Sequence, residues 1–219
     1  MSFDVLAPHY RWMEVVLAGE KLQQCRTAFL GRVAGANKVL ILGEGNGRFL
    51  LECRRELPNA KITCVDVSAR MLGLARERLT RHGARCERID FVCADALAWK
   101  PAEGGFDLIV THFFLDCFTP EQLAALVGKL ANVAAPRANW LLADFQAASS
   151  GWRRVRSRLI LWSMYRFFRV VTRLPAAQLT SPDALLTQYG FKLREQRVSD
   201  WGLLRSDCWE RPGGLGQLT

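Results

Sequence analysis

Val39-Leu-Ile-Leu-Gly43-Glu-Gly45-Asn-Gly47-Arg-Phe49 is the stretch of sequence that decides the fold of this chain. Four apolar residues of strand type run directly into three glycines that are spaced two residues apart. A strand that ends in such a turn brings its backbone close to a ligand, because glycine has no side chain to collide with it. The helix expected after the turn points its N-terminal amide groups at that ligand.

A second strand-like segment, residues 61–66, ends in Asp66. A carboxylate one strand away from the glycine turn is placed to accept hydrogen bonds from a ribose diol. The two features together predict a nucleoside site. The third glycine, Gly47, comes one residue earlier than in the dinucleotide fingerprint, where position 48 holds Arg48 instead. This spacing argues against a dehydrogenase.

The rest of the chain alternates between strand-like and helix-like segments, which predicts a parallel sheet with helices on both faces. The last two strands follow each other without a helix between them, so we expect an antiparallel hairpin at the sheet edge. The predicted class is α/β, a Rossmann-like, doubly wound and mostly parallel sheet with a helical N-terminal cap. The expected helices are 8–33, 47–56, 68–82, a short one near 95–99, 120–134 and 181–189; the expected strands are 38–42, 61–66, 88–93, 106–112, 139–145, 191–198 and 201–210.

Four segments resemble, in the expected order, the motifs of the class I S-adenosylmethionine-dependent methyltransferases. They are the glycine turn with its strand, Val65–Leu72, Phe91–Ala96 and Gly105–His112. The resemblance covers about residues 36–146 and implies S-adenosyl-L-methionine as the cofactor. It also implies a single domain over residues 1–219, divided into a helical cap (1–35), a cofactor-binding core (36–146), a basic helical insertion (147–180) and a closing helix with hairpin (181–219).

In this family the acid of the second motif binds the ribose hydroxyls, the acid of the third contacts the adenine amino group, and the fourth strand flanks the methionine moiety. Asp66 and Asp95 hold these acid positions, although each could instead cap the helix that follows it. Asp107, at the start of a strand, is expected to be structural. The cofactor-binding residues expected from the resemblance are Gly43, Glu44, Gly45, Gly47, Asp66, Val67, Met71, Asp95, Ala96 and Thr111.

The chain departs from the family at the turn itself. Ile41 stands where the family usually has an aspartate that helps to hold the cofactor's ammonium group, and Glu44 stands where it has a small or uncharged residue. We hypothesise that Glu44 supplies the missing negative charge. The alternative is an exposed loop carboxylate with no such role.

The acceptor side is less clearly marked. A base is needed only if the acceptor loses a proton. His112 and Asp144 lie at the ends of predicted strands, at the edge where doubly wound sheets bind ligands, and Tyr10 belongs to the segment Phe3-Asp4-Val-Leu6-Ala7-Pro-His-Tyr10. That segment is similar to the opening of the ubiquinone/menaquinone C-methyltransferase group, in which the tyrosine reaches the site. The candidate catalytic residues are therefore His112, Tyr10 and Asp144, with His9 and Asp116 as further candidates.

The N-terminal match has one departure and one alternative. Arg11 follows Tyr10 where the group has aspartate. The segment could also be an ordinary N-terminal helix that packs on the sheet.

Composition and cysteine spacing indicate the cellular location and the kinds of site to expect. The chain has 219 residues, a net charge of +9 and seven cysteines, and no Cys-x-x-Cys pair occurs. We therefore expect a reducing, cytoplasmic location and no metal site. We see neither a secretory signal nor an apolar run long enough for a spanning helix.

The basic residues concentrate near the C-terminus. Residues 151–219 hold 12 of the 30 basic residues and 5 of the 21 acidic ones. Between positions 152 and 174 there are seven arginines and no acid, with apolar residues on much of the opposite helical face. Such a segment suits a peripheral membrane contact or an acidic acceptor. RNA phosphates, or a helix packed on the sheet with a solvated basic face, remain open.

These features predict a methyltransferase that acts on a small, hydrophobic or membrane-associated acceptor. An RNA methyltransferase is one alternative, although Thr111-His-Phe-Phe114 differs from the Asn/Asp-Pro-Pro-Tyr/Phe motif of amino-group enzymes and nucleic acid is not the expected partner. A cofactor-binding protein without transfer activity is another. The oligomeric state and the acceptor are not indicated.

Overall fold

The computed structural model describes residues 19–146, 151–152, 154–156 and 180–213. These residues form one seven-stranded sheet with the strand order β3-β2-β1-β4-β5-β7-β6. Only β7 runs antiparallel to its neighbours, and it lies between β5 and β6. The predicted α/β class, with its mostly parallel sheet and closing hairpin, is confirmed. The strands are β1 (Lys38–Leu42), β2 (Lys61–Asp66), β3 (Ile89–Cys93), β4 (Phe106–His112), β5 (Ala134–Phe145), β6 (Lys192–Ser199) and β7 (Leu204–Arg211).

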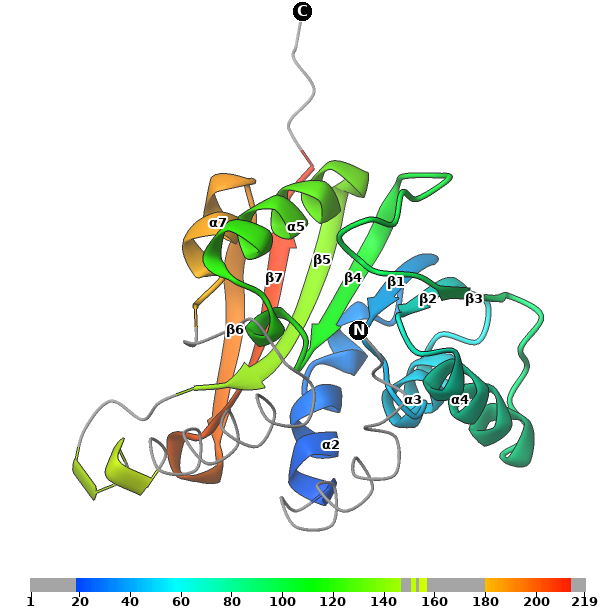
Figure 1. The fold of residues 1–219 in the computed structure, drawn as a ribbon, viewed down its shortest axis with the longest axis horizontal. Coiled ribbons are helices and arrows are strands. Elements are labelled where there is room, and N and C mark those ends of the chain that lie inside the picture. Colours follow the sequence, from blue (N-terminus) through cyan, green and yellow to red (C-terminus); the bar gives the residue numbers. More distant parts are fainter. Residues whose placement is uncertain (1–18, 147–150, 153, 157–179, 214–219) are drawn as a thin grey trace, which may run out of the picture.

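Helices cover both faces of the sheet, with α5 and α7 in the upper part of Figure 1 and α2, α3 and α4 in the lower part. Each face buries its own apolar cluster: one packs Phe49 and Leu50 of α3 against the strands, and the other packs Leu123 and Leu126 of α5 around Trp140. Burial on both faces explains why the strands read as nearly continuous apolar runs. The described helices are α2 (Gly19–Thr27), α3 (Arg48–Glu56), α4 (Ala69–Arg81), α5 (Pro120–Val133) and α7 (Asp183–Gln188), with 3₁₀ turns at Leu30–Val33, Leu115–Cys117 and Asp200–Gly202.

The expected helix near residues 95–99 is wrong, because this segment forms a turn. The Nζ atom of Lys129 on α5 donates to the carbonyl oxygens of Ala96, Leu97 and Trp99, at 2.5 to 2.9 Å. These carbonyls are therefore satisfied by a side chain from α5 rather than by a helix of their own. No local pattern in the sequence announces a partner more than thirty residues away.

Two strands also differ from their predicted bounds. β5 begins at Ala134, five residues earlier than expected, and Pro136 lies where the pairing register with β4 shifts. Proline is tolerated in a strand at such an irregularity because it has no amide hydrogen to donate. β7 begins only at Leu204, because residues Asp200–Gly202 form a 3₁₀ turn.

The expected N-terminal helix and the expected basic insertion are only partly covered by the described residues. The part of the expected helix 8–33 that is described forms α2 and ends in the 3₁₀ turn Leu30–Val33, while most of the expected basic insertion, 147–180, lies outside the described residues. Asp107 is structural, as predicted: its carboxylate accepts from the amides of Asn37 and Lys38, each at 2.9 Å. No helix in the described ranges is long and apolar enough to cross a membrane.

Candidate functional site

The glycine turn lies where β1 meets α3. Gly43, Gly45 and Gly47 all have positive φ angles, of 66°, 72° and 82°. A Cβ atom on Gly43 would lie 2.3 Å from the Phe114 ring, and one on Gly47 would lie 2.6 Å from Cα of Ala75 in α4. The turn therefore needs glycine both for its backbone angles and for its close neighbours. The turn lies at the carboxyl edge of the sheet, with the Phe114 ring packed against Gly43 and α4 packed against Gly47.

Asp66 ties this turn to the end of β2. One carboxylate oxygen accepts from the amide of Gly45 at 3.3 Å, and the other accepts from the amide of Ser68 at 2.9 Å. The N-cap of α4 is Ser68, whose hydroxyl accepts from the amide of Met71. Asp66 is thus not the cap residue of that helix. Its carboxylate lies directly beside the glycine backbone, where a ribose diol would be held.

The end of β3 completes the same edge. Asp66 pairs with Cys93 in the parallel register, and the amide of Ala94 donates to the Asp66 carbonyl oxygen, which brings Asp95 to the neighbouring position. The Asp95 carboxylate accepts from the amide of Leu97 within the turn. Asp95 is exposed, whereas Ala96 is buried.

Two further residues of the second motif flank this edge. Val67 is 42% exposed and Met71 is buried. Asp66, Val67 and Asp95 thus lie at the same carboxyl edge of the sheet, where the ends of β2 and β3 meet.

Thr111 occupies a different environment from the one expected. Its side chain is completely buried, and its hydroxyl accepts from Nε1 of Trp140 at 2.8 Å. This bond lies in the core beneath α5, so the side chain does not reach the ligand edge. We therefore leave Thr111 out of the proposed cofactor site.

Glu44 is buried rather than exposed. Its carboxylate accepts from the amide of Leu50 in the first turn of α3, at 2.9 Å. Burial raises the pKa of Glu44 to about 7, although the Leu50 amide and the nearby Arg26 both oppose the rise. The carboxylate thus satisfies a helix N-terminus inside the protein. Our hypothesis that it holds the cofactor's ammonium group stays a prediction.

Replacing Glu44 by glutamine should change how stability depends on pH. Because the pKa is higher in the folded state, the stability that Glu44 contributes is present below about pH 4.5 and is lost as the pH rises through about 7. We expect the free energy of unfolding of the native chain, relative to Glu44→Gln, to fall by about 3 kcal/mol across this range. Urea unfolding of both proteins at pH 5 and pH 8 measures this difference.

The comparison with Glu44→Gln is needed because His112 titrates with the opposite sign. Burial lowers the pKa of His112 well below 6.5, so its contribution to stability is lost as the pH falls. This contribution is common to both proteins and cancels in the difference. Parallel pH profiles of the two proteins would contradict a buried, titrating Glu44.

The structure also places a buried cation, which the sequence did not single out, close to Glu44 and His112. Arg26, on α2, is only 7% exposed, and its guanidinium lies 5.3 Å from the centre of the Phe113 ring. Its charge lowers the pKa values of both Glu44 and His112, so it lies near both of them. The sequence did contain a signal for the burial of Arg26: it is four residues from both Leu22 and Leu30, on the apolar face of the helix.

The two candidate proton acceptors lie on opposite faces of the sheet. His112 packs edge-on against Phe49 of α3, with the ring centroids 4.5 Å apart, and its Nδ1 atom has no hydrogen-bond partner among the described residues. Asp144 is opposite Arg205 of β7, and the Arg205 guanidinium binds Asp183 of α7. The sequence reading could not separate these roles, because both residues simply end a strand.

Asp144 lies close to a second acid. Burial raises the pKa of Asp144, and the neighbouring charge of Asp116 raises it further. Asp116 is itself buried, and its carboxylate accepts from the thiol of Cys117 at 3.5 Å. Two carboxylates in one buried place cannot both ionise easily, so one of them tends to hold a proton.

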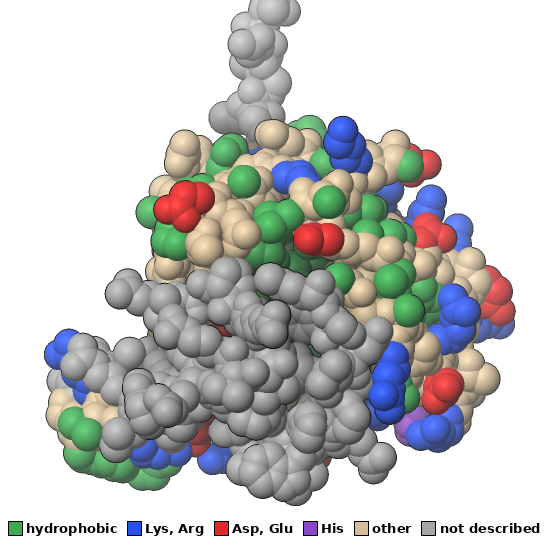
Figure 2. Space-filling model, viewed as in Figure 1, with side chains coloured by type: hydrophobic (Ala, Val, Ile, Leu, Met, Phe, Trp, Pro, Cys, Tyr) green, Lys and Arg blue, Asp and Glu red, His purple; other side chains and the backbone are tan. Residues whose placement is uncertain are grey.

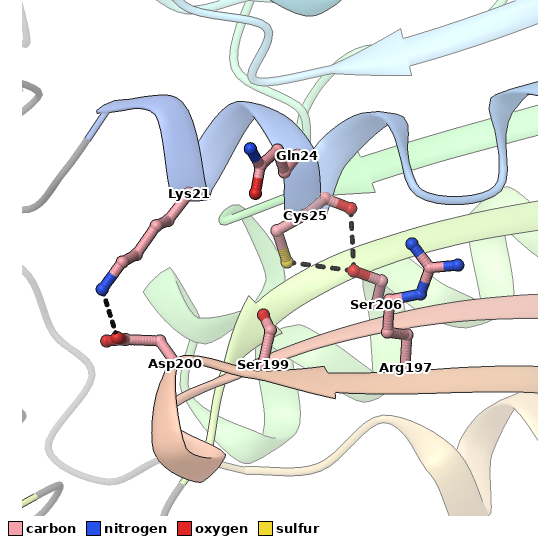
Figure 3. Close-up of a pocket in the computed structure, with 7 residues that line it drawn as sticks. All are labelled: Lys21, Gln24, Cys25, Arg197, Ser199, Asp200 and Ser206. Atoms are coloured by element: carbon pink, nitrogen blue, oxygen red, sulfur yellow. Dashed lines mark hydrogen bonds and ion pairs between the residues drawn. The ribbon is translucent and has the colours of Figure 1, made fainter.

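Polar contacts fix α2 against β7 (Figure 3). The hydroxyl of Ser206 lies 2.8 Å from the carbonyl oxygen of Cys25 and 3.1 Å from its sulfur, and Lys21 forms an ion pair with Asp200 at 2.7 Å. A cavity of about 230 Å³ lies between these contacts. Burial raises the pKa of the Cys25 thiol to about 11, so this thiol is unreactive. The contacts hold in place the helix that carries Arg26.

Tyr10 and His9 lie outside the described residues, as does most of the arginine-rich segment 152–174. Their expected roles stay predictions.

Comparison with known proteins agrees with this geometry. Residues 39–137 match the family model described as a methyltransferase domain. The chain is 28% identical to the demethylmenaquinone methyltransferase of Thermus thermophilus, over 68% of this chain and 66% of that protein. It is 40% identical to the release factor glutamine methyltransferase of Chlorobaculum tepidum, over 36% of this chain and 28% of that protein. The chain thus matches less than two thirds of the length of either curated relative.

A solved structure shows the same fold. The N-methyltransferase NodS from Bradyrhizobium japonicum, in complex with S-adenosyl-L-homocysteine, has a TM-score of 0.63 at 17% identity, over 88% of this chain and 86% of that one. The matched domain begins at the first strand and includes the glycine turn, Asp66 and Asp95. Residues 39–137 therefore match a methyltransferase domain in sequence, and the chain shares the fold of a solved methyltransferase.

Proposed function

We propose that this protein transfers a methyl group from S-adenosyl-L-methionine to a small, hydrophobic acceptor. The observation that carries the proposal is the joint position of the glycine turn and Asp66, whose carboxylate accepts from the amide of Gly45 inside the turn. A cofactor held there by its ribose would place its methionine end toward β4. The cofactor supplies an electrophilic methyl group on a sulfonium, which an acceptor atom displaces in line.

Each part of the cofactor has a matching group at this edge. In the proposed complex the ligand would lie against the glycine turn, Asp66 would face the ribose, and Asp95 with Val67 would face the adenine. The amino-acid end would lie near Arg26 and Glu44. Arg26 supplies a cation for a carboxylate there, and Glu44 supplies an acceptor for an ammonium group. Residues Gly43, Glu44, Gly45, Gly47, Asp66, Val67, Met71, Asp95 and Ala96 therefore make up the proposed site, with Arg26 added.

Aromatic side chains support a hydrophobic acceptor. Phe113 directly follows β4 and Phe145 ends the neighbouring β5, and their ring centroids lie 4.9 Å apart. The ring centroids of Phe114 and Phe118 lie 5.1 Å apart. Phe113 has a φ of 51°, a strained conformation for an aromatic residue, and such strain is concentrated at functional sites. Three of these rings are only partly buried, so they can line an apolar site beside the methyl donor. The demethylmenaquinone methyltransferase similarity is compatible with such an acceptor.

Asp144 is the residue we place as proton acceptor. Once ionised, a carboxylate with a raised pKa is a stronger base than an ordinary one, and a single proton held by the Asp116–Asp144 pair leaves one carboxylate able to accept another. Burial instead keeps His112 neutral and makes it a weaker base. His112 and Tyr10 then serve to orient the acceptor, and the membrane contact through residues 152–174 would bring a lipid-borne acceptor to this edge.

Asp144→Asn should separate transfer from cofactor binding. We expect kcat to fall about 100-fold, the size typical for loss of a general base, while the Kd for S-adenosylmethionine stays within about twofold. His112→Gln should lower kcat by less than Asp144→Asn. Steady-state kinetics with calorimetry on both variants makes the comparison, and the reverse ranking would reassign the base to His112.

The proposed activity is tested with S-adenosylmethionine labelled in its methyl group. The purified protein is incubated with a bacterial lipid extract, and label is followed into the organic phase. We expect an organic-soluble product that heat-inactivated protein does not form. Label recovered in added RNA would favour the RNA methyltransferase alternative. Cofactor binding with no labelled product in any fraction would favour a binding protein without transfer activity.

A further inference from the structure

Two tryptophans lie together on the surface at one corner of the molecule. Trp152 and Trp201 are 61% and 56% exposed, and their ring centroids are 5.7 Å apart. Val155, 60% exposed, belongs to the same helical segment as Trp152. We call these three side chains the tryptophan corner. In Figure 1 it lies at the lower left, where residues 151–156 meet the turn between β6 and β7, and Figure 2 shows hydrophobic side chains beside basic ones there.

The backbone of this turn is strained in a way that keeps Trp201 at the surface. Asp200 and Trp201 have φ angles of 46° and 59°. This left-handed region is unfavourable for non-glycine residues, and bulky residues are rare there. Side chains over-determine the turn, because Lys21 and Arg156 both pair with Asp200, at 2.7 and 3.4 Å. Strain maintained at an exposed aromatic residue indicates a function for that residue.

The charge around the corner is strongly biased. From Gln146 to Pro182 the sequence contains seven arginines and no acid. Arg154 and Arg156 of this run are described and lie in the same segment as Trp152. Asp200 is the acid that both Lys21 and Arg156 bind, so cations outnumber acids at this corner.

These features identify the chemistry of the partner. Tryptophan prefers the boundary between the headgroups and acyl chains of a bilayer, where its apolar ring and its N–H are both accommodated. Neighbouring arginines add electrostatic attraction to anionic headgroups. We propose that the tryptophan corner docks on the surface of an anionic lipid bilayer, with Trp152, Val155 and Trp201 entering the interface.

The position of the corner fits the proposed function, on which the purpose of docking rests. The turn follows the end of β6 and precedes Leu204, which pairs with Phe145 at the end of β5. The amide of Gln146 donates to the carbonyl oxygen of Leu203 at 2.8 Å, which fixes the turn beside that end. Docking would therefore bring the edge that carries Phe145 and Asp144 close to the membrane, where a lipophilic acceptor is dissolved.

Sedimentation of the full chain with vesicles tests the docking without requiring transfer. Vesicles of phosphatidylglycerol and phosphatidylcholine are compared with vesicles of phosphatidylcholine alone, at low and high salt. We expect binding to the anionic vesicles that weakens with salt. The double variant Trp152→Ala/Trp201→Asn should lower the partition coefficient at least about tenfold. Asparagine is chosen at position 201 because it tolerates a positive φ.

The matched control is Leu193→Ala/Val198→Ala, which removes two exposed apolar side chains of β6 outside the corner, 42% and 50% exposed. This variant should bind vesicles like the native chain. Calorimetry with S-adenosylmethionine on all three proteins shows that the fold and the proposed cofactor site are intact. Equal loss of vesicle binding in both variants, or no vesicle binding by a native chain that binds the cofactor, would overturn the docking surface and leave the proposed function standing. Binding to an RNA oligonucleotide but not to vesicles would also overturn it.

Discussion

Replacing Gly47 by alanine is expected to abolish measurable cofactor binding and to lower the free energy of unfolding by about 3 kcal/mol. The new Cβ would lie 2.6 Å from Cα of Ala75 and 2.9 Å from its Cβ. Backbone atoms of α4 cannot move aside as a flexible side chain could, so the turn or the helix must shift. Because the ligand is proposed to lie against the turn, a shift of even one ångström removes its fit.

Gly105→Ala is the matched control for this variant. Gly105 has a φ of 81°, almost the same as the 82° of Gly47, but a Cβ there would meet nothing within 4 Å. Gly105→Ala therefore measures the cost of the backbone angle alone, about 1–2 kcal/mol. Urea unfolding gives the two stability changes, and calorimetry gives cofactor affinity. Equal stability losses with cofactor binding retained in both variants would contradict the role of the close approach.

Replacing Asp66 by asparagine is expected to weaken S-adenosylmethionine binding about 100-fold. The carboxylate would accept two charge-assisted hydrogen bonds from the ribose diol, and the amide of asparagine cannot accept both. The substitution preserves the side-chain shape, its oxygen can still accept from the amide of Ser68 at 2.9 Å, and only the longer bond from the amide of Gly45, at 3.3 Å, is lost. The variant should therefore fold normally and fail in binding. Calorimetry measures the Kd, and thermal unfolding checks the fold.

Asp90→Asn controls for the loss of one negative charge near the site. Asp90 lies on β3, the strand next to β2, its side chain is 60% exposed, and its ion pair with Lys61 is long, at 3.9 Å. We expect its Kd for S-adenosylmethionine to stay within about twofold, since exposed ion pairs contribute little. An Asp66→Asn protein that binds the cofactor as tightly as Asp90→Asn would show that Asp66 only positions the glycine turn.

Most of the sheet could be predicted because strand and turn patterns depend on residues that are neighbours in the sequence. The run Val39–Leu42 followed by glycines marks the end of β1, and Asp66 and Asp95 mark the ends of β2 and β3. Strand ends gather at one edge of a parallel sheet, so the sequence could place these residues together. The parallel pairing and the closing hairpin followed from the same alternation, whereas the strand order β3-β2-β1-β4-β5-β7-β6 was not predicted.

Contacts between distant residues could not be predicted in this way. Lys129 replaces the helix expected near 95–99 with a turn, from more than thirty residues away. Glu44 looked like an exposed loop residue, because its burial depends on how α2 and α3 pack over the turn. His112 and Asp144 each lie at the end of a strand. His112 is in register with Ala143, so Asp144, the next residue, points to the opposite face of the sheet.

The tryptophan corner illustrates the same limit. Trp152 and Trp201 are far apart in the sequence and meet only because the turn between β6 and β7 lies beside residues 151–156. The charge bias of the region was visible in the sequence, whereas the exposed aromatic pair was not.

We propose that the edge formed by the glycine turn, Asp66 and Asp95 binds S-adenosylmethionine, and titration calorimetry of the full chain with S-adenosylmethionine, S-adenosylhomocysteine and NAD⁺ tests this binding. We expect one binding site per chain for each of the two sulfur nucleosides, competition between them, and no heat with NAD⁺. Binding of NAD⁺ without binding of S-adenosylmethionine would contradict it.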